Sequence, residues 1–336
     1  MAVFAGALAT SAIVAQYEAA ASNQVISPSK DMLEPANPAS LADDRQASLQ
    51  RPLSLALWKK TIPSGSYPLP NAVGTDTKTC WHFENCRYSL ILFNRRSEER
   101  QQLDLVIPPP EIRSRIVSTS HSEEEYRSIG IGGSAAILST LAPHTDLAKR
   151  KANILDFGCG CSRVLQPIHN LCPLWTLFGT DIDDVSIRWS KINISCAIFD
   201  VNQSMPPLRY GDGSFDLVYS MSVFSHLNED MEVSWLRELV RVLKPSGHLY
   251  ITFNSQHVLN QIPQRFPEEA LAAYYRNGFA YFSNIDDGIL PEWYQTSLQT
   301  HEFVKSRLPG NSSVVSHESG GCLGWQDSML IRRNEA

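Results

Sequence analysis

The sequence lacks an excess of positive charge, a regular pattern of cysteines and any long repeat. Its 336 residues carry a formal net charge of -6 at pH 7. A net negative chain has no long-range attraction to phosphate backbones or to anionic lipid. We therefore expect neither nucleic acid nor a membrane surface as its partner. With 43% hydrophobic and 19% charged residues, the composition is that of a globular protein with a sizeable core.

Signals for export and for metal binding are also missing. Residues 1–15 are apolar, but no Lys or Arg precedes the apolar run, and the stretch is too short to span a bilayer. The seven cysteines are odd in number and form no disulfide framework, which favours reduced thiols and a cytoplasmic protein, with an exported one as the alternative. Cys80, His82 and Cys86 lack a second ligand pair at zinc spacing, so we expect no metal.

Composition divides the chain into three parts. Residues 1–55, rich in Ser, Pro, Asn and Gln towards their end, are predicted to be a poorly ordered or helical extension. Residues 56–150 form a lead-in segment, in which Ser122 begins a helix that is expected to continue past a glycine-rich break to about Leu147. Residues 151–336 form the main domain.

The main domain alternates short apolar runs with helix-length segments. Five runs predict strands, at residues 153–157, 175–178, 196–199, 215–219 and 248–253. The best helix pattern covers residues 229–243, with apolar residues three and four positions apart. This alternation predicts an α/β fold with a doubly wound, mostly parallel sheet, whose ligand binds at the carboxyl ends of the strands.

Acidic residues and glycines end the first two strands of this domain. Asp156-Phe-Gly158-Cys-Gly160 follows the first strand, and Asp181 ends the next, where it could accept hydrogen bonds from ribose hydroxyls. An NAD site needs a third glycine where Arg163 stands, and an acid at Asp156 would repel a pyrophosphate. The amino group and sulfonium of S-adenosylmethionine (SAM) are positive, so the pattern favours SAM over NAD.

These motifs resemble those of the class I SAM-dependent methyltransferases. Asp156-x-Gly158-x-Gly160 resembles motif I, and Asp181 matches the acid that holds the ribose. Residues 216–227 and 239–247 resemble the later motifs, in the family's order. The resemblance implies a Rossmann-like sheet of seven strands, and it implies further cofactor contacts at three positions: Ile182, Asn202 and Ser220.

Methyl transfer to a hydroxyl needs a base, and His226 follows the fourth strand on the expected acceptor side. We predict that His226 is this base; the alternative is a histidine whose hydrogen bonds are satisfied at a helix start. An aromatic-rich insertion at residues 257–300 is expected to form a helical subdomain, with some rings in its own core and some at the acceptor pocket.

Residues 108–130 and 320–332 resemble a bacterial subgroup of methyltransferase-domain proteins that are often encoded with glycosyltransferases. The sequence thus predicts an enzyme that transfers a methyl group from SAM to an oxygen or nitrogen of a small-molecule or glycan acceptor. A non-catalytic SAM-binding module and an NAD-dependent oxidoreductase are the alternatives. The acidic charge and the residues Ser220-Met-Ser-Val, in place of an Asn/Asp-Pro-Pro-Tyr/Phe motif, argue against a nucleic-acid methyltransferase.

Overall fold

The computed structural model describes the backbone of four strands between residues 65 and 102 and all of residues 105–116, 122–283 and 294–335. The predicted extension (1–55) and the side chains of Cys80, His82 and Cys86 lie outside the described residues. The four strands form an antiparallel sheet in chain order: β1 (Gly65–Pro68), β2 (Thr77–Glu84), β3 (Arg87–Asn94) and β4 (Arg100–Gln102).

The central sheet has seven strands in the order β12-β13-β9-β8-β5-β6-β7. They are β5 (Ala152–Phe157), β6 (Trp175–Asp181), β7 (Ala197–Val201), β8 (Phe215–Ser220), β9 (Leu243–Phe253), β12 (Ser312–Cys322) and β13 (Gln326–Arg333). Strands β5 to β9 pair in parallel, whereas β13 is antiparallel to β9 and to β12. This topology confirms the predicted Rossmann-like, mostly parallel sheet.

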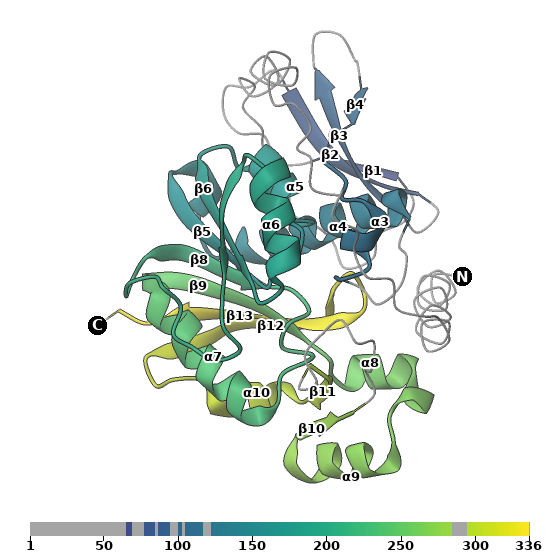
Figure 1. Cartoon of the computed structure of the whole chain (residues 1–336), viewed down its shortest axis with the longest axis vertical. Coiled ribbons are helices and arrows are strands. Elements are labelled where there is room, and N and C mark those ends of the chain that lie inside the picture. Colours follow the sequence, from purple (N-terminus) through teal and green to yellow (C-terminus); the bar gives the residue numbers. More distant parts are fainter. Residues whose placement is uncertain are drawn as a thin grey trace.

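Helices cover both faces of this sheet (Figure 1). On one face lie α4 (Glu123–Leu141), α5 (Leu165–Leu171) and α6 (Asp184–Asn193); on the other lie α7 (Glu229–Val242) and α10 (His301–Arg307). Alternate strand residues supply the two cores: Ile154 packs with the first group of helices, and Leu155 packs with the second. Because side chains alternate across a strand, a fully apolar run marks a strand that is buried on both faces.

Helix α7 shows how the sequence fixes an element. Asn228 caps it by accepting a hydrogen bond from the Met231 amide, and three acidic residues occupy the first turn. Trp235 and Leu239 are among the apolar side chains that it buries against the sheet, each worth roughly 1.5–3 kcal/mol. The helix ends at Val242, one residue before the predicted end, and β9 begins directly after it with an irregularity in its pairing with β8.

The prediction of a glycine-rich break in the first helix was wrong. Helix α4 continues without interruption from Glu123 to Leu141, and the short turn η2 (Leu147–Lys149) follows it separately. Ser122 begins the helix with a capping box, as predicted. Gly130 and Gly133 both lie within the helix. Because they lack a side chain, α4 can pass close to the segment after β5 and to the loop after β8.

The insertion forms a small subdomain with its own core (Figure 1). It contains α8 (Gln256–Gln261), η3 (Pro263–Arg265), α9 (Glu268–Asn277) and the antiparallel pair β10 (Phe279–Phe282) and β11 (Thr296–Gln299). Of its rings, Phe266 and Tyr274 are buried in this core, Tyr275 is exposed, and Tyr294 lines the pocket described below. Trp293 lies outside the described residues. Among the described helices, none has the length and apolar character needed to cross a membrane.

Candidate active site

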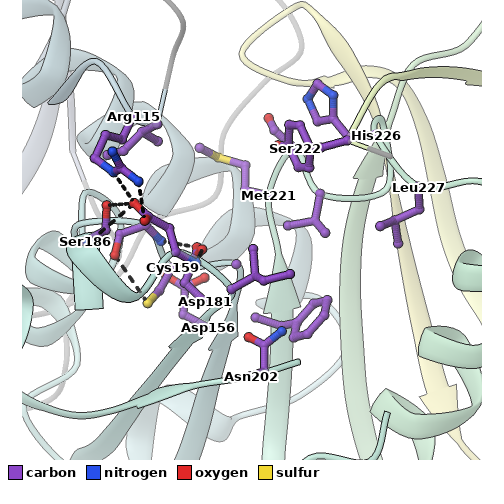
Figure 2. A pocket seen from close by; sticks show the side chains of 18 of the residues that line it. Arg115, Asp156, Cys159, Asp181, Ser186, Asn202, Met221, Ser222, His226 and Leu227 are labelled. Carbon is purple, nitrogen blue, oxygen red and sulfur yellow. Dashed lines mark hydrogen bonds and ion pairs between the residues drawn. The ribbon is translucent and has the colours of Figure 1, made fainter. Parts of the chain in front are cut away.

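A pocket lies where the parallel strands end, between the β5–α5 turn and the loop after β8 (Figure 2). Its walls come from the ends of β5, β6 and β7 on one side and from residues 221–227 on the other. Arg115 and Ile116, which follow the short helix α3 (Pro110–Arg113), also line it, as does Tyr294 from the insertion. The carboxyl edge of a parallel sheet is the expected ligand site of this architecture.

The β5–α5 turn brings main chain close to the pocket. Gly158 has a φ of 81°, and a Cβ there would lie 2.2 Å from Val223 Cγ2, so only glycine fits this conformation and this contact. Ser162, in the same turn, also has a positive φ, of 69°. Its buried hydroxyl lies 3.1 Å from the Ser190 hydroxyl, so the serine keeps the turn and ties it to α6.

Asp181 joins two segments of the pocket wall through hydrogen bonds to their backbone amides. Its Oδ2 accepts a hydrogen bond from the Gly160 amide at 2.7 Å, and its Oδ1 accepts one from the Asp183 amide at 2.8 Å. Burial raises the pKa of Asp181 to about 6, although these amide donors favour the ionised form. The turn after β5 and the end of β6 are therefore held together by one carboxylate in the pocket.

Asp156, at the end of β5, also lines the pocket but is almost fully buried, at 3% exposure. Burial raises its pKa well above the ordinary range, and the nearby Asp181 carboxylate adds to this shift. Both neighbouring carboxyl groups have raised pKa values, and a bound cation would stabilise their ionised forms.

The remaining predicted cofactor residues divide into two groups. Ile182 and Asn202 line the pocket. Asn202 is fixed because its side-chain Oδ1 accepts from Thr180 Oγ1 and its backbone N–H donates to the Asp181 carbonyl oxygen. Ser220 is fully buried and is not part of the pocket wall; its hydroxyl has no hydrogen-bond partner within the described part of the chain. The structure thus brings Asp156, Gly158, Gly160, Asp181, Ile182 and Asn202 together and leaves Ser220 beneath them.

His226 lies in the wall opposite the acidic residues (Figure 2). Its ring stacks on Tyr294, with centroids 4.3 Å apart, and its Nδ1 is 2.8 Å from the Gln295 carbonyl oxygen. Burial lowers the pKa of His226 to about 4, against the opposing effect of the Gln295 carbonyl. The ring is therefore neutral at pH 7 and can accept a hydrogen bond from a ligand.

Several pocket residues were missed at the sequence level. Arg115 and Ile116 lie 41 and 40 residues before Asp156, the first residue of motif I, and no local pattern connects them to it. Ser222 lines the pocket with a positive φ of 64°, and Tyr294 reaches it from the insertion. A sequence signal existed for two of the lining residues: Arg163, which stands three positions after Gly160, and Tyr294, one of the rings of the insertion that was expected to contribute to the acceptor pocket.

Comparison with protein families gives a match to the methyltransferase domain over residues 155–251. Two named relatives also match: a 2-methyl-6-phytyl-1,4-hydroquinone methyltransferase of Synechocystis, with 28% identity over 143 residues, and a norajmaline N-methyltransferase of Rauvolfia serpentina, with 30% over 113 residues. These alignments cover 39% and 32% of this chain, and 39% and 38% of the relatives. The chain thus spans less than half the length of either relative.

Solved structures with a similar arrangement include a SAM-dependent methyltransferase from Methanosarcina mazei, at 16% identity and a TM-score of 0.44, which covers 59% of this chain and 98% of that one. Another is a sarcosine dimethylglycine methyltransferase homologue from Galdieria sulphuraria, at 13% identity and a TM-score of 0.42, covering 59% and 84%. The matched segment, residues 155–251, runs from β5 to β9, and over this length the chain is similar to the methyltransferase domain.

Proposed function

We propose that this protein transfers a methyl group from SAM to an oxygen or nitrogen of a small-molecule or glycan acceptor. The carrying observation is that Asp156 and Asp181 share one pocket with His226 on its opposite wall (Figure 2). One wall then suits a cationic nucleoside, and the other suits the group that receives the methyl.

The pocket fits SAM by the chemistry of its donors and acceptors. Asp181 would accept hydrogen bonds from the ribose hydroxyls, and Asp156 would offset the positive charge of the methionine part. Ile182 and Asn202 would contact the adenine from the ends of β6 and β7, and the Gly158–Gly160 turn leaves room for close approach. When bound, SAM supplies an activated methyl group together with its own leaving group, so this chain has mainly to bind, orient and exclude water.

His226 is the proposed base on the acceptor side. Its neutral ring would take the proton of a hydroxyl or ammonium as that group becomes more acidic on methylation. The stack on Tyr294 and the contact with the Gln295 carbonyl hold the ring in one orientation. The two named relatives are a hydroquinone methyltransferase and a norajmaline N-methyltransferase, and their names support a small-molecule acceptor over a macromolecular one. A glycan acceptor rests on the subgroup resemblance alone.

We further propose that residues 56–150 lead into and cover the methyltransferase domain at 151–336, which carries the insertion 257–300. The positions of Arg115 and Ile116 in the pocket wall support this division. A cytoplasmic location is proposed as well, and it is supported by five free cysteines among the described residues, four of them buried.

The test is calorimetric titration with SAM and, separately, with NAD. Asp181→Ala removes the ribose acceptor, and Gly158→Arg fills the turn beside Val223, so both variants should lose SAM binding. Asp212→Ala is the matched control, because Asp212 is exposed and pairs with Arg241 away from the pocket. Binding of NAD in place of SAM would overturn the cofactor assignment. Binding of SAM without formation of S-adenosylhomocysteine by any acceptor would favour the non-catalytic module.

A further inference from the structure

A chain of side-chain hydrogen bonds lies behind the acceptor wall of the pocket. It begins at the Ser297 carbonyl oxygen on β11, which receives a hydrogen bond from Asn254 Nδ2 at 3.1 Å. Asn254 Oδ1 accepts from Gln326 Nε2 at 3.2 Å. Gln326 Oε1 in turn receives the hydroxyls of Ser222, at 2.9 Å, and of Thr252, at 2.7 Å.

The direction of every bond in this chain follows from its first member. A carbonyl oxygen can only accept, so the amide nitrogen of Asn254 must face Ser297 and its oxygen must face Gln326. The oxygen of Gln326 is then left to face the two hydroxyls, and both must donate to it. Ser222 has therefore committed its only hydrogen to the protein, and its oxygen retains lone pairs alone.

The same reasoning fixes the tautomer of His226. Its Nδ1 lies 2.8 Å from the Gln295 carbonyl oxygen, which can only accept, so Nδ1 carries the hydrogen. The neutral ring then has its lone pair at Nε2. Ser222 and His226 both line the pocket, and each is held by the protein as a hydrogen-bond acceptor.

Ser222 also has a strained backbone. It is one of four non-glycine residues with a positive φ in the described chain, and its value is 64°. Its amide donates to Thr252 Oγ1 at 2.8 Å, so the residue is held from both its main chain and its side chain. Non-glycine residues adopt this region at an energetic cost and persist there where the surroundings impose it, often at functional sites.

We propose that the acceptor substrate is a hydrogen-bond donor, a hydroxyl or an amine that bears N–H. Ser222 Oγ and His226 Nε2 are its two acceptors: they share the single hydrogen of a hydroxyl, or each receives one hydrogen of a primary amine. This inference rests on the proposed function of the pocket. Gln326 is a positioning residue, because it acts on the substrate only through Ser222. A carboxylate or a tertiary amine would place its lone pairs against those of the wall and would be disfavoured.

The experiment uses the full chain and two probes of similar shape, phenol and its methyl ether anisole, which lacks the donor. Nitrogen-15 NMR of His226 at neutral pH should show a protonated Nδ1 and an unprotonated Nε2, and the Nε2 signal should move with phenol. Phenol should bind more tightly than anisole, by about 2- to 12-fold for one hydrogen bond. A protonated Nε2, or phenol binding no better than anisole, including no binding by either, would overturn the proposal.

Variants separate positioning from folding. Ser222→Ala and Gln326→Leu should both reduce the preference for phenol, whereas Gln326→Glu, which still accepts from Ser222, should retain more of it. Ser214→Ala is the matched control, because its hydroxyl bonds the Gly211 carbonyl outside the pocket. A Gln326→Leu protein that keeps its full selectivity would contradict the positioning role. None of these measurements needs SAM, so a failure of SAM binding would be seen separately by calorimetry.

Discussion

Arg115 and Asp183 form a two-bond ion pair at the rim of the pocket, with Arg115 Nε and Nη2 each 2.7 Å from a different carboxylate oxygen. The partners are 68 residues apart in sequence. Burial alone would raise the pKa of Asp183, but the Arg115 guanidinium and the Ser186 hydroxyl lower it below the ordinary value. The pair ties the segment after α3, which lines the pocket, to the start of α6.

Removing this ion pair should release the segment after α3 from the pocket wall. In Arg115→Ala we expect SAM to dissociate roughly 5- to 30-fold faster, because a partly buried two-bond pair is worth about 1–2 kcal/mol. Stopped-flow measurement of SAM release would check this. Arg188→Ala is the control, since Arg188 forms an exposed pair with Asp184 on the same helix and should change little. Equal rates for the two variants would contradict a covering role.

Cofactor affinity should depend on pH through Asp181. The pKa of this carboxyl is raised to about 6 in the free protein, and the ionised form is the one that accepts two hydrogen bonds from ribose hydroxyls. The ionisation of Asp181 should therefore make SAM affinity fall as the pH drops below 6, by up to tenfold per unit. Calorimetry from pH 5 to 8 would measure this. In Asp181→Asn the fall in SAM affinity below pH 6 should disappear. If SAM affinity does not fall below pH 6 in the native protein, this role of Asp181 is contradicted.

Glu232 should make stability depend on pH in the opposite sense to most carboxylates. Its carboxyl group is fully buried, and burial raises its pKa from about 4.5 to about 8, although a side-chain hydrogen bond with Gln299 acts in the opposite direction. A carboxyl whose pKa is raised on folding contributes stability below the unfolded value, and this is lost as pH rises through the folded value. The loss therefore falls between pH 4.5 and 8.

We expect Glu232→Gln to be more stable than the native protein at pH 8 by on the order of 1 kcal/mol or more, and similar to it at pH 5. Urea unfolding at the two pH values would show this. Glu238→Gln, on the same helix, should instead be destabilising, because Glu238 pairs with Arg241 and accepts the Leu208 amide. Destabilisation by Glu232→Gln at pH 8 would mean that its carboxylate has a compensating partner.

Two glycines of α4 should respond differently to alanine. A Cβ on Gly130 would lie 2.2 Å from the Arg163 carbonyl oxygen, which is main chain and cannot turn away. Overpacking of this kind costs about 1–3 kcal/mol, of which the better helix propensity of alanine returns about 1 kcal/mol. A Cβ on Gly133 would meet Met221 Sδ at 2.7 Å, which can rotate. Thermal unfolding should therefore show a lower midpoint for Gly130→Ala than for Gly133→Ala.

The sequence alone was enough to predict the sheet and the acidic half of the pocket. The apolar runs predict strands buried on both faces, and the carboxyl ends of parallel strands meet at one edge. For this reason the residue pattern by itself places Asp156, Gly158, Gly160 and Asp181 together. Helix α7 was predictable in the same way, because its apolar spacing and its cap are local properties.

Only the tertiary structure decided the rest of the site. Ser222, rather than Ser220, lines the pocket, because the chain takes a left-handed turn after β8 that no local pattern reports. Gly130 lies within a continuous helix, and its lack of a side chain allows the helix to contact the Arg163 main chain rather than allowing a turn. Arg115 and Tyr294 reach the pocket from segments far away in sequence. Such contacts depend on the packing of whole elements, whereas strand, turn and cap signals depend on residues that are neighbours in the chain.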